Sequence, residues 1–176
     1  MGFLQLPFFT EIADAKSVLL AGAGGGFDIF AGLPLYFGLR REGRQVHLAN
    51  LSFSHIYASS GRRIGRALVE VDAKTRDASR YFPEIHLAKW LGSIGEPASI
   101  YCFDRTGVKP LSEAYENLCA HLGIDTVILV DGGTDSLMRG DESGLGTPQE
   151  DAASIAACRR LLRSKHFALR TTVARG

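Results

Sequence analysis

The sequence contains only three cysteines among its 176 residues, and no two of them form a Cys-x-x-Cys pair. This low, odd number argues against a disulfide framework or a structural zinc site. No apolar run reaches the roughly 18 residues that a membrane-spanning helix requires, and the first residues lack the basic start and cleavage site of a secretory signal. We therefore expect a cytoplasmic protein without a membrane partner.

Several catalytic and nucleotide-binding signatures are absent as well. The chain has no Gly-Lys-Ser/Thr of a P-loop, no Gly-x-Ser-x-Gly elbow and no His-Glu-x-x-His helix. The NAD fingerprint is also missing, because Gly22 and Gly24 match its first two glycines but Phe27 occupies the third position. The sequence therefore contains no NAD fingerprint and leaves the identity of any other organic cofactor open.

The net charge of the whole chain is only +1, but acidic side chains are absent from its last part. No acid follows Asp151, whereas the segment from Arg159 onward carries six bases. Such a segment can bind nucleic acid, or its arginines can complement the negative end of a helix, which we favour. A second basic patch, GRRIGR at 61–66, can contact phosphates or form a solvated loop.

Short apolar runs alternate with amphipathic stretches along the chain. The predicted strands are SVLLAGAG (17–24), QVHLANLS (45–52), RALVEVDA (66–73, at an edge), ASIYCF (98–103) and DTVILV (125–130). The predicted helices are 27–43, 80–96, 109–123 and 147–162. This alternation predicts a single α/β domain over 1–176, with a three-layer, mostly parallel, Rossmann-like sheet and helices on both faces.

Three local features refine this prediction. Pro34 lies inside the first predicted helix and should kink it or delay its start. SSGRRIG (59–65) is predicted as a loop. Thr147 and Glu150 have the spacing of a capping box for the last helix, and residues 164–176 are predicted as a disordered or irregular basic tail.

Unusual polar residues follow four of the predicted strands. These segments are GAGGGFD (22–28), residues 50–54, Asp104 with Arg105, and DGGTDS (131–136). In parallel sheets, ligands bind outside the carboxyl ends of the strands. We therefore expect the four segments to meet at one edge, with the carboxylates of Asp28, Asp104, Asp131 and Asp135 facing one cleft.

The glycine-rich segment after the first strand is the first candidate binding loop. Consecutive glycines let backbone N–H groups approach an anion closely, although a tight turn with Asp28 as helix N-cap explains part of the pattern. The candidate ligand-binding residues here are Gly22, Gly24, Gly25, Gly26 and Asp28, with Asn50 from the next strand.

The segment DGGTDS is the second candidate. It resembles the Ser-Gly-Gly-x-Asp-Ser loop that binds pyrophosphate in the ATP pyrophosphatase superfamily, with Asp131 in place of the first serine. A carboxylate there repels bare phosphate but suits Mg²⁺, with Asp131 and Asp135 as metal-binding and catalytic candidates. The alternative is an acidic loop that hydrogen-bonds its own backbone. Its candidate ligand-binding residues are Gly132, Gly133, Thr134 and Ser136.

Two further candidates come from the remaining segments. Arg105 can hold a carboxylate or phosphate, or can form an ion pair with Asp131 or Asp135; Asp104 beside it is a further ligand-binding candidate. His55, in LSFSHIY, is the histidine expected nearest the edge and is the candidate base.

Three segments together resemble one known family. They are LLAGAGGGFDIFAGLPLYFGLRREG, YFPEIHLAKWL and VDGGTDSLMRGDESGLGTPQEDAASIAA, and the resemblance runs from about Ser17 to Ala157. The family is domain-of-unknown-function family 1152, which implies a Rossmann-like fold and no particular activity. Its members usually continue into another strand and more helix, so the chain looks truncated or altered at its C-terminus.

Three functional hypotheses remain. The first is an enzyme, a hydrolase or transferase, acting on a phosphorylated or nucleotide-like molecule with Mg²⁺. The second is a non-catalytic module that binds an anionic small molecule at the same edge. Nucleic-acid binding ranks last, because the rest of the chain is acidic and no aromatic residues interleave with the bases.

Overall fold

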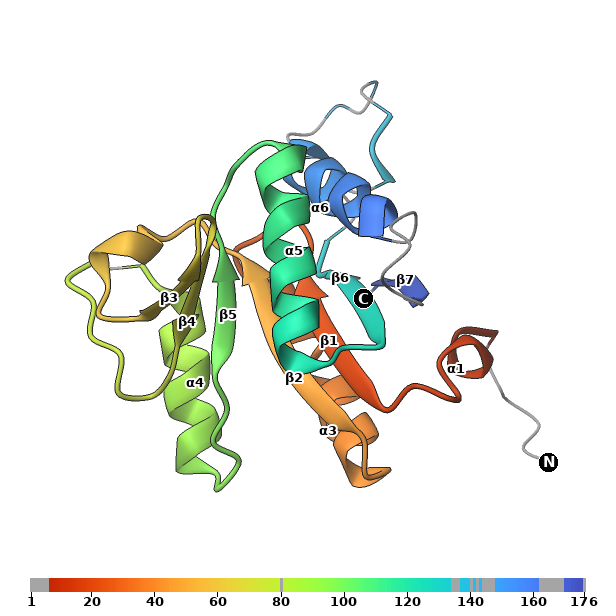
Figure 1. Ribbon diagram of the computed structural model, residues 1–176, viewed down its shortest axis with the longest axis horizontal. Helices are drawn as coiled ribbons and strands as arrows, with labels where there is room; N and C mark the ends of the chain where they lie inside the picture. Colours follow the sequence, from red (N-terminus) through yellow and green to blue (C-terminus); the bar gives the residue numbers. More distant parts are fainter. Residues whose placement is uncertain are drawn as a thin grey trace.

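Seven strands form one sheet in the order β3-β4-β5-β2-β1-β6-β7 (Figure 1). The computed structural model describes residues 7–79, 81–133, 137–139, 141, 143, 148–161 and 170–175. The strands are β1 (Ser17–Gly22), β2 (Gln45–Leu51), β3 (Arg62–Gly65), β4 (Leu68–Val71), β5 (Ile100–Phe103), β6 (Thr126–Asp131) and β7 (Arg170–Arg175).

Most neighbouring strands are parallel. Strands β5, β2, β1, β6 and β7 run in one direction, and the antiparallel hairpin β3–β4 extends the sheet beside β5. Because the five parallel strands end at the same edge, their carboxyl ends deliver the following loops to one side of the molecule. This confirms the predicted α/β, mostly parallel sheet.

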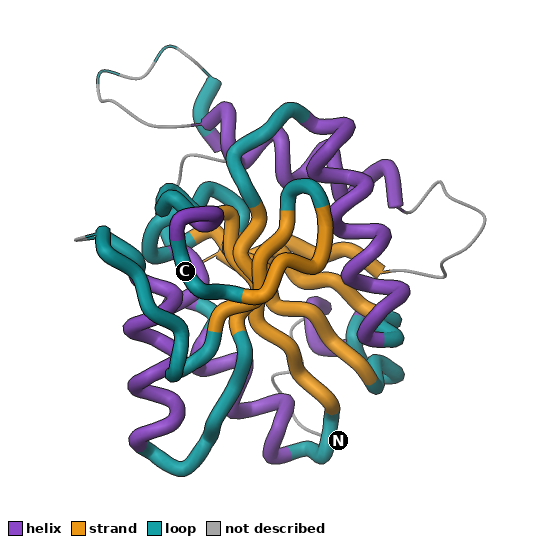
Figure 2. Tube along the Cα trace, turned by 60° about the vertical axis from the view of Figure 1, so that its left-hand side comes forward, coloured by secondary structure: helices purple, strands orange, loops and turns teal. Residues whose placement is uncertain are grey.

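Helices cover both faces of the sheet, which makes three layers (Figure 2). The helices are α1 (Pro7–Glu11), α2 (Asp28–Ala31), α3 (Leu33–Arg41), the 3-10 helix η1 (Ile56–Ala58), α4 (Pro83–Ser93), α5 (Val108–Leu122) and α6 (Pro148–Leu161). Side chains alternate along β1, so Leu19 packs in the core with α5 and α6, whereas Leu20 packs in the core with α2, α3 and α4. Within the described part of the chain, every helix is too short or too polar to span a lipid bilayer.

The first crossover contains a break that the sequence predicts. The expected helix 27–43 is divided into α2 and α3, with Gly32 between them and Pro34 in the first turn of α3. Proline fits the first turn because the N–H that it lacks would have no helical partner there. The predicted effect of Pro34 is therefore confirmed.

The structure corrects three predictions. Residues 62–65 of the predicted loop form the edge strand β3, so the predicted edge strand, β4, lies between β3 and β5. Arg62 and Glu70 lie opposite each other in this hairpin and form a salt bridge of 2.5 Å, which is a charged pairing suited to an exposed edge.

The third correction concerns the predicted irregular tail over 164–176. Residues Arg170–Arg175 form β7, paired in parallel with β6, and Thr171, Thr172 and Val173 are β-branched residues that favour strands. The remainder of the predicted tail and Thr147 of the predicted capping box lie outside the described residues.

Candidate functional site

The four polar segments that follow β1, β2, β5 and β6 meet at the carboxyl edge of the sheet. Asn50 Nδ2 donates a hydrogen bond of 3.1 Å to the carbonyl oxygen of Gly26, which joins β2 to the loop after β1. The Gly132 N–H donates a bond of 3.1 Å to Asp28 Oδ1, which joins the loop after β6 to the start of α2. The guanidinium of Arg105 lies 5.0 Å from the centre of the Phe53 ring, which joins the segments after β5 and β2.

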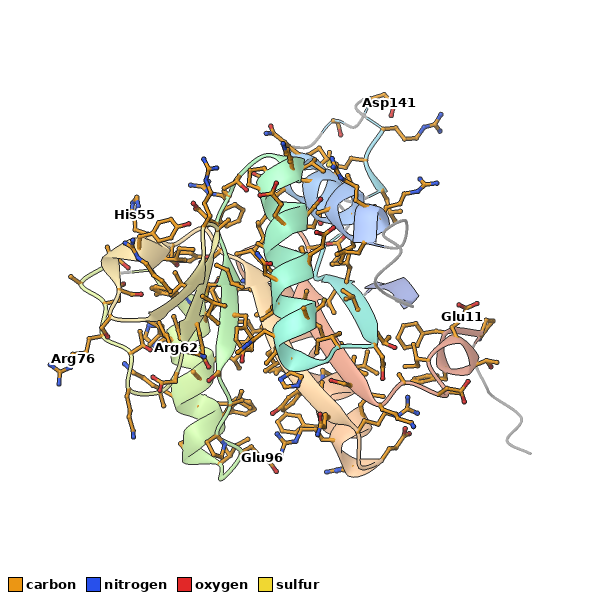
Figure 3. The ribbon with its side chains drawn as sticks, in the orientation of Figure 1. Glu11, His55, Arg62, Arg76, Glu96 and Asp141 are labelled. Carbon is orange, nitrogen blue, oxygen red and sulfur yellow. The ribbon has the colours of Figure 1, made fainter. Side chains whose placement is uncertain are left out.

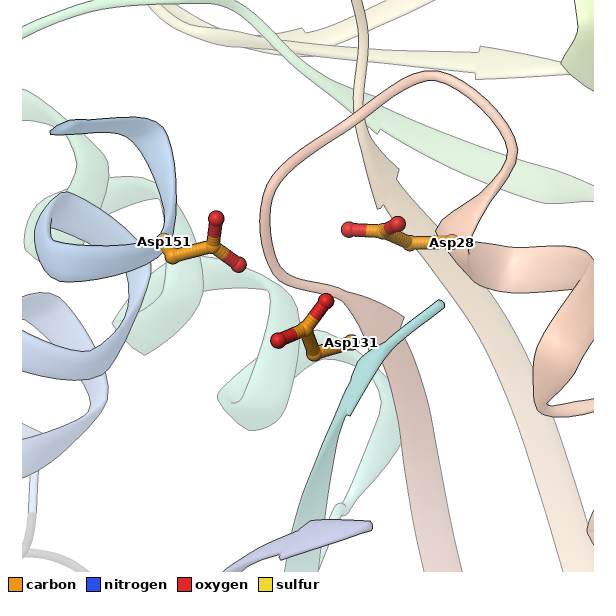
Figure 4. A group of neighbouring side chains, drawn as sticks. All are labelled: Asp28, Asp131 and Asp151. Carbon is orange, nitrogen blue, oxygen red and sulfur yellow. The ribbon is translucent and has the colours of Figure 1, made fainter. Parts of the chain in front are cut away.

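Three aspartates come together at this edge, and we call them the acidic cluster. One carboxylate oxygen from each of Asp28, Asp131 and Asp151 lies within 4.8 Å of the other two. Figure 4 shows the three side chains pointing toward one another from α2, β6 and α6. Asp131 and Asp151 are only 2% and 1% exposed, whereas Asp28 is half-buried.

Backbone N–H groups hold two members of the cluster in place. The N–H of Gly24 donates a hydrogen bond of 2.7 Å to Asp28 Oδ2, and Asp28 Oδ1 accepts the bond from the N–H of Gly132. Asp28 is the first residue of α2 rather than its N-cap, so its carboxylate joins two loops instead of capping the helix. Asp131 Oδ1 accepts a bond of 2.8 Å from the N–H of Gly133.

Helix α6 brings Asp151 to the cluster from its first turn. Three residues later, Ser154 Oγ donates a hydrogen bond of 2.6 Å to the carbonyl oxygen of Ala23, which ties α6 to the glycine-rich loop. The hydroxyl group is fully buried, so this bond satisfies polar atoms that would otherwise lose their water. The glycine-rich loop therefore fixes both Asp28 and the helix that carries Asp151.

The glycines of this loop make room for neighbouring side chains. A Cβ atom on Gly24 would lie 2.6 Å from Asp151 Oδ2, and one on Gly22 would lie 2.0 Å from Asn50 Oδ1. Both distances are shorter than real contacts of a Cβ atom. Gly25 and Gly26 have φ angles of +93° and +60°, which residues with a side chain rarely adopt.

A further buried acid, Glu84, lies at the start of α4 and contacts Asn50 beside the glycine-rich loop. It is fully buried, and Glu84 Oε1 accepts a hydrogen bond of 2.8 Å from Asn50 Nδ2. Burial raises the pKa of Glu84, and the bond from Asn50 acts in the opposite direction. Asn50 Oδ1 and Glu84 Oε2 have no hydrogen-bond partner among the described residues.

The segment after β5 lines two separate clefts. Arg105 lines a cleft of about 280 Å³ with Glu150 and Gly107, next to the start of α6. Asp104 does not belong to the acidic cluster, because it lines a separate cleft with Tyr57 and Arg66. The expectation that Asp104 shares one cleft with the other carboxylates is therefore wrong.

The candidate base His55 is not part of the acidic cluster. His55 is exposed at the start of η1, and Figure 3 shows it on the side of the molecule that carries the β3–β4 hairpin, away from α6. Three candidates of the acidic loop, Thr134, Asp135 and Ser136, lie outside the described residues.

The sequence reasoning missed Asp151 and Glu84. Both lie in the first turn of a helix, where an acid is expected to complement the helix dipole. Their near-complete burial distinguishes them from ordinary first-turn acids. For Asp151, the available signal was Ser154, a second small polar residue three positions later; for Glu84, it was the apolar neighbours Phe82, Pro83 and Ile85.

A comparison with protein-family models matches residues 58–173 to the family described as Protein of unknown function (DUF1152). The chain belongs to this family. The match confirms the family resemblance and covers two of the three segments that indicate it, including Asp131 and Asp151 of the acidic cluster. Asp28 and the glycine-rich loop precede the matched residues. No curated protein matches the chain.

Proposed function

We propose that this DUF1152 protein binds Mg²⁺ at the acidic cluster, together with a phosphorylated or nucleotide-like small molecule at the same edge of the sheet. The single observation that carries the proposal is the convergence of Asp28, Asp131 and Asp151 to within 4.8 Å. The three free, buried cysteines suit a cytoplasmic location.

The chemistry of the donor atoms favours Mg²⁺ over softer metals. All three candidate ligands are carboxylates, whereas zinc sites are typically built from cysteine and histidine. Magnesium usually takes one or two protein carboxylates and completes its shell with water and substrate phosphate. A bound Mg²⁺ would offset the repulsion between the three carboxylates and attract an anionic ligand.

The surrounding groups suit the anionic part of a ligand. Arg105 lines the 280 Å³ cleft between the start of α5 and the start of α6, and a guanidinium pairs well with phosphate oxygens. The metal would neutralise developing charge on a phosphate, which is the chemistry of a hydrolase or transferase.

One observation favours the alternative, a module that binds the same ligand without reacting it. The candidate base His55 lies away from the cluster, immediately before η1. In that case the carboxylates and Arg105 would select the ligand, and no turnover would follow. Incubation of a panel of nucleotides and sugar phosphates with Mg²⁺, followed by product analysis, distinguishes the two functions.

Calorimetric titration with MgCl₂ tests the metal site. The Asp131→Asn and Asp151→Asn variants should each weaken Mg²⁺ binding by about tenfold or more, because each loses one charged ligand. Asp141→Asn is the matched control, since Asp141 is exposed and lies outside the cluster. Equal Mg²⁺ affinity in the wild type, Asp131→Asn and Asp151→Asn would refute the metal site.

A further inference from the structure

The basic segment Gly61–Arg66 forms one wall of a second cleft, on the hairpin side of the same edge. The cleft measures about 760 Å³, within the range of small-molecule sites, and is lined in part by Tyr57, Arg63, Arg66, Asp104 and Thr106. None of these residues belongs to the acidic cluster. We call it the arginine cleft.

The hairpin register separates the arginines of this segment by role. Arg62 lies opposite Glu70 and forms a salt bridge with it. Arg63 is the next residue along β3 and therefore points to the other face of the strand, where its guanidinium lies 5.0 Å from the centre of the Tyr57 ring. Neither Arg63 nor Arg66 forms an ion pair with a described residue.

Hydrogen bonds fix the walls of the arginine cleft. Tyr57 donates a bond of 2.5 Å from its hydroxyl to the carbonyl oxygen of Arg66. The N–H of Asp104 donates a bond of 3.1 Å to the carbonyl oxygen of Ala67, which joins the end of β5 to the start of β4. Arg63 and Arg66 therefore extend from a hairpin whose backbone is held by hydrogen bonds to neighbouring segments.

The charged groups of the cleft lie close enough to influence one another. Burial and, after it, the Asp104 carboxylate raise the pKa of the Tyr57 hydroxyl, whereas Arg63 and Arg66 act in the opposite direction. The cleft thus combines two cationic donors with one carboxylate acceptor. Two guanidinium groups suit a phosphate, and a carboxylate beside them suits a sugar hydroxyl.

We propose that the arginine cleft binds a sugar phosphate, with Arg63 and Arg66 on the phosphate and Asp104 accepting a hydrogen bond from a sugar hydroxyl. The N-terminus of α5 also favours an anion there. Its first turn contains no acid, and its N-cap, Gly107, provides no side-chain cap. This site does not depend on the metal of the proposed function. The two proposals can therefore fail separately.

Calorimetric titration in EDTA tests the proposal without any metal, with ribose 5-phosphate, inorganic phosphate and ribose as probes. Ribose 5-phosphate should bind more tightly than phosphate, and ribose should bind least. Arg63→Gln and Arg66→Gln should each weaken ribose 5-phosphate binding by about tenfold or more. Arg62→Gln is the matched control on the same strand and should change the affinity by less than about twofold.

The Asp104→Asn variant tests the second half of the proposal. It should bind inorganic phosphate at least as tightly as the wild type, because a repulsive charge is removed, and should lose most of the preference for ribose 5-phosphate. Circular dichroism would verify the fold of each variant. Equal losses in Arg62→Gln and Arg63→Gln would overturn the proposal, as would tighter binding of a single-stranded oligonucleotide than of ribose 5-phosphate.

Discussion

Single glycines determine how closely the acidic side chains can approach the glycine-rich loop. The space that a Cβ atom of Gly24 would fill is occupied by the carboxylate of Asp151, at 2.6 Å from its Oδ2. The Gly24 N–H also donates to Asp28. One residue without a side chain therefore contacts two of the three aspartates, which explains its place in the loop better than a turn conformation does.

Gly24→Ala should push the Asp151 carboxylate away and disturb the acidic cluster. We expect a loss of about 1–3 kcal/mol in the free energy of unfolding, the usual cost of adding a methyl group to a filled space, and weaker Mg²⁺ binding. Urea denaturation and calorimetry measure the two effects. Gly92→Ala is the control, since its added Cβ would lie 3.7 Å from that of Ala73, an ordinary contact; similar losses in both variants would contradict this account.

Glu84 gives a pH dependence whose direction follows from its burial. Because burial raises its pKa in the folded protein, its contribution to stability is full below the unfolded pKa and is lost as pH rises through the folded pKa. Glu84→Gln should therefore become more stable relative to the wild type as pH rises from about 4 toward 7. Chemical denaturation across this range measures the difference, and a difference that stays constant would contradict the assignment.

At the scale of helices and strands, local sequence rules predicted most elements but not the edges of the sheet. Buried strands such as β1 and β6 are continuous apolar runs, so their positions follow from the sequence alone. Strand β3 contains Arg62, Arg63 and Gly65, a composition typical of a loop. It becomes a strand because β4 provides hydrogen-bond partners and Glu70 pairs with Arg62, both of which depend on tertiary structure.

Replacement of glycine by alanine should change the free energy of unfolding in opposite directions at two positions, one inside α3 and one at the end of α5. Gly38 lies inside α3, and an added Cβ atom would have no described neighbour within 4 Å other than the backbone of its own helix. Gly38→Ala should therefore raise the free energy of unfolding by about 0.5–1 kcal/mol. Gly123 ends α5 with a φ angle of +64°, so Gly123→Ala should lower it by about 1 kcal/mol. Thermal and urea unfolding of both variants measure the signs, and equal signs would refute the assignment of backbone strain.

At the scale of the whole molecule, the sequence predicted that distant loops meet at one edge of the sheet, but it did not predict which residues form the acidic cluster. Parallel strands place their carboxyl ends at one edge, which is sufficient to bring Asp28 and Asp131 together from the sequence pattern alone. Asp151 joins them only because α6 packs with its first turn against the glycine-rich loop, through Ser154 and Ala23. Asp104 departs from them because its cleft opens toward the hairpin instead.

The central claim is that three carboxylates, from α2, β6 and α6, form one Mg²⁺ site. Anomalous diffraction from crystals soaked in Mn²⁺, which prefers the same oxygen ligands, tests it most directly. We predict one strong peak within coordinating distance of Asp28, Asp131 and Asp151. The absence of any peak there, or a peak bound only by other residues, would contradict the claim.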